Sequence, residues 1–273
     1  MITKHLIAAA LAGLMALGTA SDAAAERRTS SLAKDVAVRH RRLLVKNRLE
    51  LAPLMESTIN ADFKHIIGAG AKLEYHLSDM LSVGAVGVFS TALNTKLVDR
   101  ITPTLENMAD PATREPSREE FESRLNNMPL HGAAYASLTP WYGKLAAFSQ
   151  AYVAFDFYFQ AGLAFAQLDS KCPTNVCSDT DPNDMPDSNP NNDPPLNSGG
   201  RLGLYLGGGI HVFLNDFIAL DLTIRDYAFT DNPSGADFNA NLRVTKDDSR
   251  FAHHLFFGAG VAIMFPTKVK RTP

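Results

Sequence analysis

The chain has 273 residues, and its 26 Lys and Arg nearly balance 29 Asp and Glu, which gives a net charge of −3. This balance disfavours nucleic-acid binding through overall charge, and a hydrophobic content of 45% excludes a disordered chain. Mean hydropathy is −0.09, and beyond the N-terminus no apolar run reaches the roughly 18 residues of a membrane-spanning helix. The composition leaves two classes, a soluble globular protein and a transmembrane β-barrel, because a barrel conceals its membrane signal by alternating apolar and polar residues.

The N-terminus predicts export. Lys4 and His5 begin a secretory signal peptide at residues 1–25, an apolar core follows over 6–17, and alanines at 23–25 provide the small residues of a cleavage site. Cleavage after Ala20 and a buried N-terminal helix are the alternatives. The remaining chain is expected to form a basic periplasmic extension (26–47), a barrel (48–265) and a periplasmic tail (266–273).

Alternation with period two is the strongest signal in the mature chain. From Val153 to Phe165, every second residue is apolar, and the residues between are polar or small. This pattern predicts strands at 48–58, 65–77, 80–91, 131–142, 152–168, 199–214, 217–229 and 253–265. They are longer than the roughly 5–6 residues of soluble strands and meet the roughly 9–11 that cross a bilayer.

The two faces of these strands and their connections favour a membrane barrel. One face carries Phe, Leu, Ile and Val, whereas the other is dominated by Gly and Ala with scattered charges. Short connections at 78–79, 143–151 and 215–216 alternate with long ones at 92–130, 169–198 and 230–252, and only the short connection at 59–64 breaks the pattern. We therefore predict an all-β, eight-stranded, antiparallel, up-and-down transmembrane β-barrel in the outer membrane.

Several stretches resemble the outer-membrane β-barrel domain family of myxobacteria and relatives, which are small barrels of the OmpA type. They are VRHRRLLVKNRLELAP at 38–53, TPWYGK at 139–144, FDFYFQAG at 155–162 and LNDFIALDLTIRDY at 214–227. The resemblance implies an integral outer-membrane protein with no established enzymatic role. Some members of this family belong to envelope-spanning machineries, including that of gliding motility. The 92–130 insertion and the loop rich in Asp, Asn and Pro depart from the family pattern.

Charged residues on the expected inner face must pair, because an unpaired buried charge is costly. The interior of an eight-stranded barrel is only wide enough for side chains, so these residues predict a plug of ion pairs, with a narrow ion path as the alternative. The candidates are Glu50, Lys72, Glu74, His76, Asp156, Arg201, Asp221 and Arg225. The glycine clusters at 68–72, 206–210 and 258–260 are expected to relieve crowding in this interior, since none precedes a helix as a phosphate-binding loop must.

Aromatic residues near the predicted strand ends predict girdles at the two membrane interfaces. They are Tyr75, Phe89, Trp141, Tyr142, Tyr227, Phe229 and Phe265. Ordinary core aromatics are the alternative interpretation. His253 and His254 lie near the outer rim, where barrel enzymes that modify lipid carry their catalytic groups, but no nucleophile accompanies them in the sequence.

The loop at 169–197 holds both cysteines, Cys172 and Cys177, and the oxidising compartment predicts a disulfide between them. Asp179, Asp181 and Asn183 have the oxygen-ligand spacing of a calcium loop. Asp184 and Pro190 stand where an EF-hand needs Gly and Glu, so at most weak Ca²⁺ binding is expected, and no other cofactor. A loop helix is expected at 112–127.

The extension at 26–47 is rich in Arg and Lys and predicts docking to an acidic periplasmic partner or to anionic head groups. Solubility of a flexible segment is the plain alternative. The sequence therefore predicts a non-enzymatic outer-membrane barrel that anchors an envelope complex, in motility or surface assembly, through this extension and the long external loops. A small-conductance channel and a lipid-modifying enzyme are the alternatives.

Overall fold

The structure is a computed structural model that describes residues 45–59, 61–106, 118, 121, 125, 127–147, 151–169, 199–236, 238 and 246–267. The chain divides into two units, residues 1–42 and 43–273, and all described residues lie in the second. The predicted signal peptide and the basic extension up to residue 44 lie outside the described residues, as do residues 268–273 and most of the predicted helix at 112–127.

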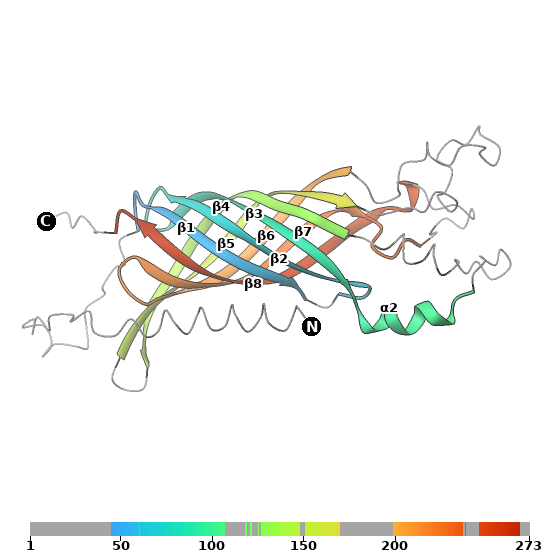
Figure 1. The fold of residues 1–273 in the computed structure, drawn as a ribbon. Helices are drawn as coiled ribbons and strands as arrows, with labels where there is room; N and C mark the ends of the chain where they lie inside the picture. The colour runs from blue at the N-terminus through green and yellow to red at the C-terminus, as the bar shows by residue number, and fades with distance from the viewer. Residues whose placement is uncertain are drawn as a thin grey trace, which may run out of the picture. The chain divides into compact units, whose positions relative to one another are not determined.

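Eight antiparallel strands close into one barrel, each paired with its neighbours in chain order and β1 paired with β8 (Figure 1). The strands are β1 (Leu49–Thr58), β2 (Lys64–His76), β3 (Leu81–Asn94), β4 (Asn127–Ala147), β5 (Ala151–Asp169), β6 (Gly199–Phe213), β7 (Ile218–Asp231) and β8 (Arg250–Phe265). The eight predicted strands and the predicted barrel are thereby confirmed. Full closure leaves the barrel wall without an unpaired edge.

One predicted turn is wrong. The sequence assigned 143–151 to the connection between the fourth and fifth strands, but β4 and β5 stay paired as far as Ala147 and Ala151. The alternation of apolar residues weakens in the sequence there, whereas the backbone ladder continues.

The two ends of the barrel differ. We call the end with β1's first residue and β8's last the turn end; its connections are 77–80, 148–150 and 214–217. We call the opposite end the loop end; its connections are 59–63, 95–126, 170–198 and 232–249. The loop end carries α2 (Lys96–Ile101), η3 (Thr102–Thr104) and η5 (Lys246–Asp248). None of the described helices is long and apolar enough to span a membrane.

Glycines on the inner face make room for tyrosine rings. A Cβ atom on Gly209 would lie 2.5 Å from the Tyr158 hydroxyl and 2.5 Å from the Leu222 carbonyl oxygen, whereas one on Gly87, on the outer face, would meet nothing within 4 Å. We expect Gly209→Val to lower the free energy of unfolding by about 1–3 kcal/mol through overpacking, and Gly87→Val to leave it nearly unchanged. Urea unfolding in lipid vesicles measures both, and equal effects would contradict the crowded interior.

Candidate functional site: the ion-paired interior and the rims

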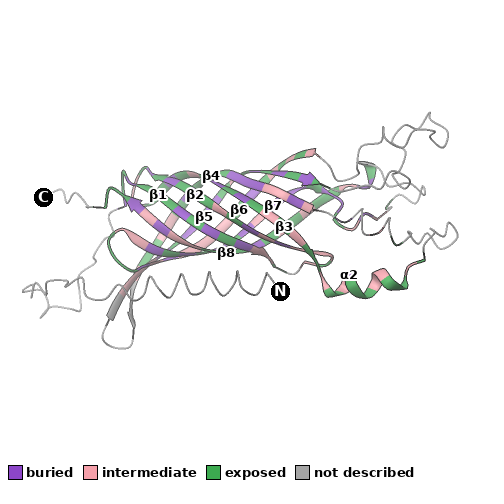
Figure 2. Cartoon of the chain, in the orientation of Figure 1, coloured by how far each residue is buried: buried purple, intermediate pink, exposed green. Residues whose placement is uncertain are grey.

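The barrel is apolar outside and charged inside. Large apolar side chains are exposed around the wall, with exposed fractions of 84% for Leu202, 73% for Phe89 and 67% for Leu163. Lys72 and Arg225, in contrast, are among the largest fully buried side chains. Figure 2 shows buried and exposed residues alternating along the strands. This arrangement is the inverse of a water-soluble barrel and matches a wall that faces lipid.

The half of the interior next to the turn end is organised by one buried ammonium group. Lys72 Nζ lies 2.7 Å from Glu50 Oε1 and 2.7 Å from Asp221 Oδ2, and 3.2 Å from the Nε2 atom of His211. The same His211 ring places Nδ1 2.9 Å from Asp156 Oδ1. We call Lys72, Glu50, Asp221, His211, Asp156, Glu74 and His76 the lysine cluster.

The remaining carboxylate of the lysine cluster, Glu74, also has donors. It accepts hydrogen bonds from the hydroxyl groups of Ser82 and Tyr135 and from the Gln160 amide. His76 Nε2 lies 3.1 Å from Glu50 Oε2. Each carboxylate of the cluster therefore faces a cation, a ring nitrogen or a hydrogen-bond donor, as a desolvated carboxylate requires.

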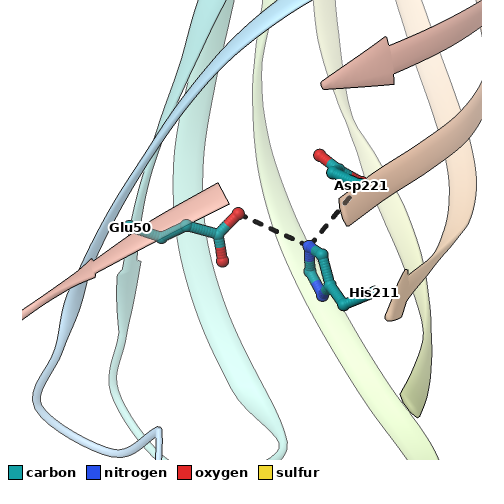
Figure 3. Close-up of side chains that lie close together, drawn as sticks. All are labelled: Glu50, His211 and Asp221. Carbon is teal, nitrogen blue, oxygen red and sulfur yellow. Dashed lines mark ion pairs between the residues drawn. The ribbon is translucent and has the colours of Figure 1, made fainter. Parts of the chain in front are cut away.

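Three members of the lysine cluster could be mistaken for a metal site. Ligand atoms of Glu50, His211 and Asp221 lie within 4.8 Å of one another, and Figure 3 shows them converging from three strands. The Lys72 ammonium already bonds a carboxylate oxygen of Glu50 and of Asp221. It supplies the positive charge between the two carboxylates that a metal ion would otherwise supply, so the donor set does not fit a resident metal.

A second cluster fills the half next to the loop end. Arg225 Nη1 lies 2.8 Å from Glu56 Oε2, and the other oxygen of this carboxylate lies 2.5 Å from His131 Nε2. The Nδ1 atom of His131 faces the Ser90 hydroxyl, which itself donates to the Met128 carbonyl oxygen. Both ring nitrogens of His131 therefore have a polar partner within hydrogen-bond distance.

Aromatic rings close the space between the two clusters. Tyr135 stacks on Tyr205 with ring centroids 5.4 Å apart, and Tyr205 lies 5.3 Å from Tyr227. Tyr227 and Phe256 in turn pack against His131. All these rings are buried. The interior is thus filled by ion pairs and rings, as expected for eight strands.

Seven of the eight predicted interior residues are buried together, and Arg201 is not. Its side chain is half-buried near the loop end, and its guanidinium donates to the Gly200 carbonyl oxygen at 3.5 Å. It lies beyond the two clusters because β6 begins only two residues earlier. Sequence analysis missed Glu56, His131 and His211 as partners, although alternation places Glu56 on the same face as Glu50 and His211 on the same face as Arg201.

Two predicted girdle residues are wrong. Tyr227 and Phe229 are buried in the interior, because they share the parity of Asp221 and Arg225 along β7. Tyr75, Trp141, Tyr142, Phe89 and Phe265 are exposed on the wall. Tyr75, Trp141, Tyr142 and Phe265 lie near the turn end, where a girdle at one membrane interface is expected.

The last residues of the predicted extension cap the turn end. The backbone N–H groups of Val45 and Lys46 donate to Asp79 Oδ1, at 3.2 and 3.1 Å, and the Val45 side chain is buried. The Arg48 guanidinium donates to the carbonyl oxygens of Asp216 and Met264. Burial lowers the pKa of Arg48, and the nearby Asp216 carboxylate opposes this shift. The chain therefore enters β1 from a fixed point at the turn end.

The two histidines of the loop-end rim have different surroundings. His254 points inward, with Nε2 3.0 Å from Asp231 Oδ2, whereas His253 is on the outer face, with Nδ1 2.6 Å from Asp226 Oδ2. Both line a cavity of about 300 Å³ together with Phe63, Lys64 and Ser234. Each histidine thus has a carboxylate partner, a feature that the sequence did not reveal.

A serine–histidine pair also lies near the loop end. Ser57 Oγ is 2.9 Å from His65 Nε2, and Thr58 Oγ1 is 3.2 Å from Nδ1 of the same ring. By strand parity, Ser57 and His65 lie on the outer face of β1 and β2. Only the register of the two strands brings them together, so no sequence pattern indicated this pair.

The predicted disulfide of Cys172 and Cys177 and the predicted calcium ligands Asp179, Asp181 and Asn183 lie outside the described residues.

Comparisons with known proteins find likeness in fold only. No family model and no curated protein matches the chain, so the resemblance to the myxobacterial barrel family gains no support there. Among solved structures, the N-terminal β-barrel domain of Pseudomonas aeruginosa OprF has a TM-score of 0.39 at 9% identity, covering 81% of this chain and 98% of that one. The outer membrane protein OprG of the same organism has 0.40 at 10%, covering 81% and 96%. Ail, the attachment invasion locus protein of Yersinia pestis, has 0.35 at 10%, covering 81% and 99%.

Proposed function

We propose that this chain is an integral β-barrel of the bacterial outer membrane, and that it serves as an anchor for an envelope complex rather than as a pore. The observation that carries the membrane assignment is the inverted distribution of side chains. Leu163, Leu202 and Phe89 are exposed on the wall, while Lys72 and Arg225 are fully buried. A closed β-barrel satisfies all wall backbone groups internally, which a lipid environment demands.

The unequal connections set the orientation. Short turns at one end and long loops at the other are typical of outer-membrane barrels, which keep the short turns in the periplasm. The turn end, with Val45 and Arg48, is then periplasmic, and the loop end faces outward. In this orientation the basic extension before Val45 begins in the periplasm.

Fractionation of cells that express the full chain tests the membrane assignment. We expect the mature protein to remain with outer membranes after alkaline washing, to dissolve only in detergent, and to migrate differently on gels before and after boiling. A mature chain that is soluble in aqueous extracts would refute the assignment.

The filled interior predicts that the barrel does not conduct ions. The lysine cluster, the Arg225 cluster and the tyrosine rings between them occupy the described interior with buried, mutually contacting side chains. In planar lipid bilayers we expect the purified protein to show no steady conductance above the bare membrane. Discrete, reproducible channel openings would instead favour the small-conductance channel.

The proposed anchoring role rests on the basic extension and on the resemblance to the myxobacterial barrel family. Some members of that family belong to envelope-spanning machineries, such as that of gliding motility. The basic charge of residues 26–47 favours an acidic periplasmic partner or anionic head groups. Deleting residues 26–42 leaves the Val45–Asp79 and Arg48 contacts in place, so the barrel should still insert. We expect this deletion to remove crosslinked periplasmic partners; an unchanged crosslinking pattern would contradict the role of the extension.

A lipid-modifying enzyme is the second candidate function. The Ser57–His65 pair favours it, because a serine hydroxyl within hydrogen-bond reach of an imidazole nitrogen is the arrangement of an activated nucleophile. The pair lies on the wall that would face lipid. If Ser57→Ala, His65→Ala and the double replacement of His253 and His254 all leave the acyl composition of outer-membrane lipid unchanged, this candidate is dismissed.

A further inference from the structure

One strand edge outside the closed wall has no partner among the residues that the structure describes. The ladder between β3 and β4 ends at Leu81 and Leu138, and the N–H of Thr139 still donates to the Met80 carbonyl oxygen at 2.8 Å. β4 then continues to Ala147 and pairs only with β5. Figure 1 shows this hairpin passing beyond the neighbouring strands. Among the described residues, no backbone group pairs with the other edge of residues 140–147.

This edge is poorly protected against pairing with another strand. Proteins usually shield an exposed edge with several charges or with a proline inside it. The sequence TPWYGKLAA at 139–147 holds one charge, and Pro140 stands at its beginning, at the register shift between Leu138 and Trp141. Trp141 and Tyr142 are 62% and 50% exposed at the start of the free edge. Backbone groups and two aromatic side chains are therefore available for binding.

The chemistry of the edge defines its occupant. A row of unpaired N–H and C=O groups is complementary to an extended strand, and peptides are recognised in this way by sheet edges. All eight described strands of this chain are already used in the barrel. A second copy in the same membrane is disfavoured, because a twofold axis along the membrane normal keeps both β4 strands running in the same direction, which prevents an antiparallel ladder between them.

We propose that residues Trp141–Ala147 of β4 are a docking edge on which an extended segment of a periplasmic protein adds as an antiparallel strand. The inference rests on the proposed function, which places the turn end in the periplasm. β4 runs from the loop end toward the periplasm, so the added strand runs toward the membrane. The nearly uncharged edge suits a segment rich in β-branched and aromatic residues.

Amide hydrogen exchange of the full mature chain in lipid nanodiscs tests this docking edge. The probe is a synthetic peptide, TVTVEVT, with a matched peptide that is N-methylated at alternate residues and cannot form a ladder. We expect the first peptide to slow exchange in Tyr142–Ala147 by about tenfold or more, and the methylated peptide to have no effect. Amides of Ala219–Thr223, in a strand paired on both edges, are the internal control.

Three results would overturn the inference. The first is equal behaviour of the two peptides. The second is protection in the protein alone that disappears on deletion of residues 26–42, which would assign the edge to this chain's own extension. The third is protection that rises with protein concentration, which would assign it to a second copy. Failure to enter nanodiscs would contradict the proposed membrane function, whereas a folded barrel that ignores the peptide contradicts the docking edge alone.

Discussion

Replacing Lys72 by methionine should lower the free energy of unfolding of the barrel by about 3–5 kcal/mol, the cost of leaving buried carboxylates without their counter-charge. The lysine ammonium bonds Glu50 and Asp221, each at 2.7 Å, and all three side chains are at most 1% exposed. Methionine keeps most of the volume and removes the charge. The result would be two desolvated carboxylates without the ammonium between them, with the imidazole rings of His211 and His76 as neighbours.

Urea unfolding of the protein in phospholipid vesicles measures this effect. Trp141 is the only tryptophan and is 62% exposed near the turn end, so its fluorescence reports the change in its surroundings when the barrel unfolds. Lys46→Met is the matched control, because Lys46 is exposed at the turn end, and it should change the free energy of unfolding by less than about 0.5 kcal/mol.

A second replacement separates lost charge pairing from lost packing. Adding Asp221→Asn to Lys72→Met removes one of the stranded carboxylates, and we expect it to recover at least about 1 kcal/mol. An additive double variant, or a Lys72→Met protein as stable as the parent, would show that the lysine cluster does not organise the interior.

Replacing Leu163 by arginine should reduce the stability of the membrane-inserted barrel by about 2–4 kcal/mol, the depth-dependent cost of a charge at the lipid-facing midplane. Leu163 is 67% exposed in the middle of β5, among the outward residues Phe159, Ala161 and Phe165. In a water-soluble protein the same exposed position would tolerate arginine with almost no loss. The prediction therefore distinguishes a wall that faces lipid from one that faces water.

The matched control lies on the same face of the same strand. Gln167 is exposed four residues nearer the loop end, where an interface rather than the bilayer core is expected, and Gln167→Arg should cost no more than about 1 kcal/mol. Both variants are compared by urea unfolding in vesicles and by the inserted fraction after refolding. Equal stability of the parent and Leu163→Arg would remove the main support for the membrane assignment.

Together the two predictions concern opposite faces of one wall. A charge is required at Lys72 and is not tolerated at Leu163, although the sequence places both on long alternating strands. A barrel whose interior is packed with ion pairs gains a rigid register, since shifting a strand by one residue would move its charges into lipid. Such rigidity suits the proposed anchoring role, for which the β4 edge and the extension are the proposed partner-binding elements.

The strands of this protein were predictable because the side-chain period of a strand is two and the wall separates an apolar outer face from a charged interior. Alternation alone located all eight strands and identified Glu50, Lys72, Asp221 and Arg225 as interior residues. Where the prediction of Tyr227 and Phe229 relied on position near a strand end and ignored parity, it was wrong.

What only the tertiary structure decided is which side chains meet across strands. The Lys72–Asp221 pair, the Glu56–His131–Arg225 contacts and the Ser57–His65 pair depend on register and closure, which join residues as far as 169 positions apart. The edge of β4 that is unpaired among the described residues could not be predicted from the sequence either. The residues of β4 determine its own length, whereas an unpaired edge depends on where the neighbouring strand β3 stops pairing with it.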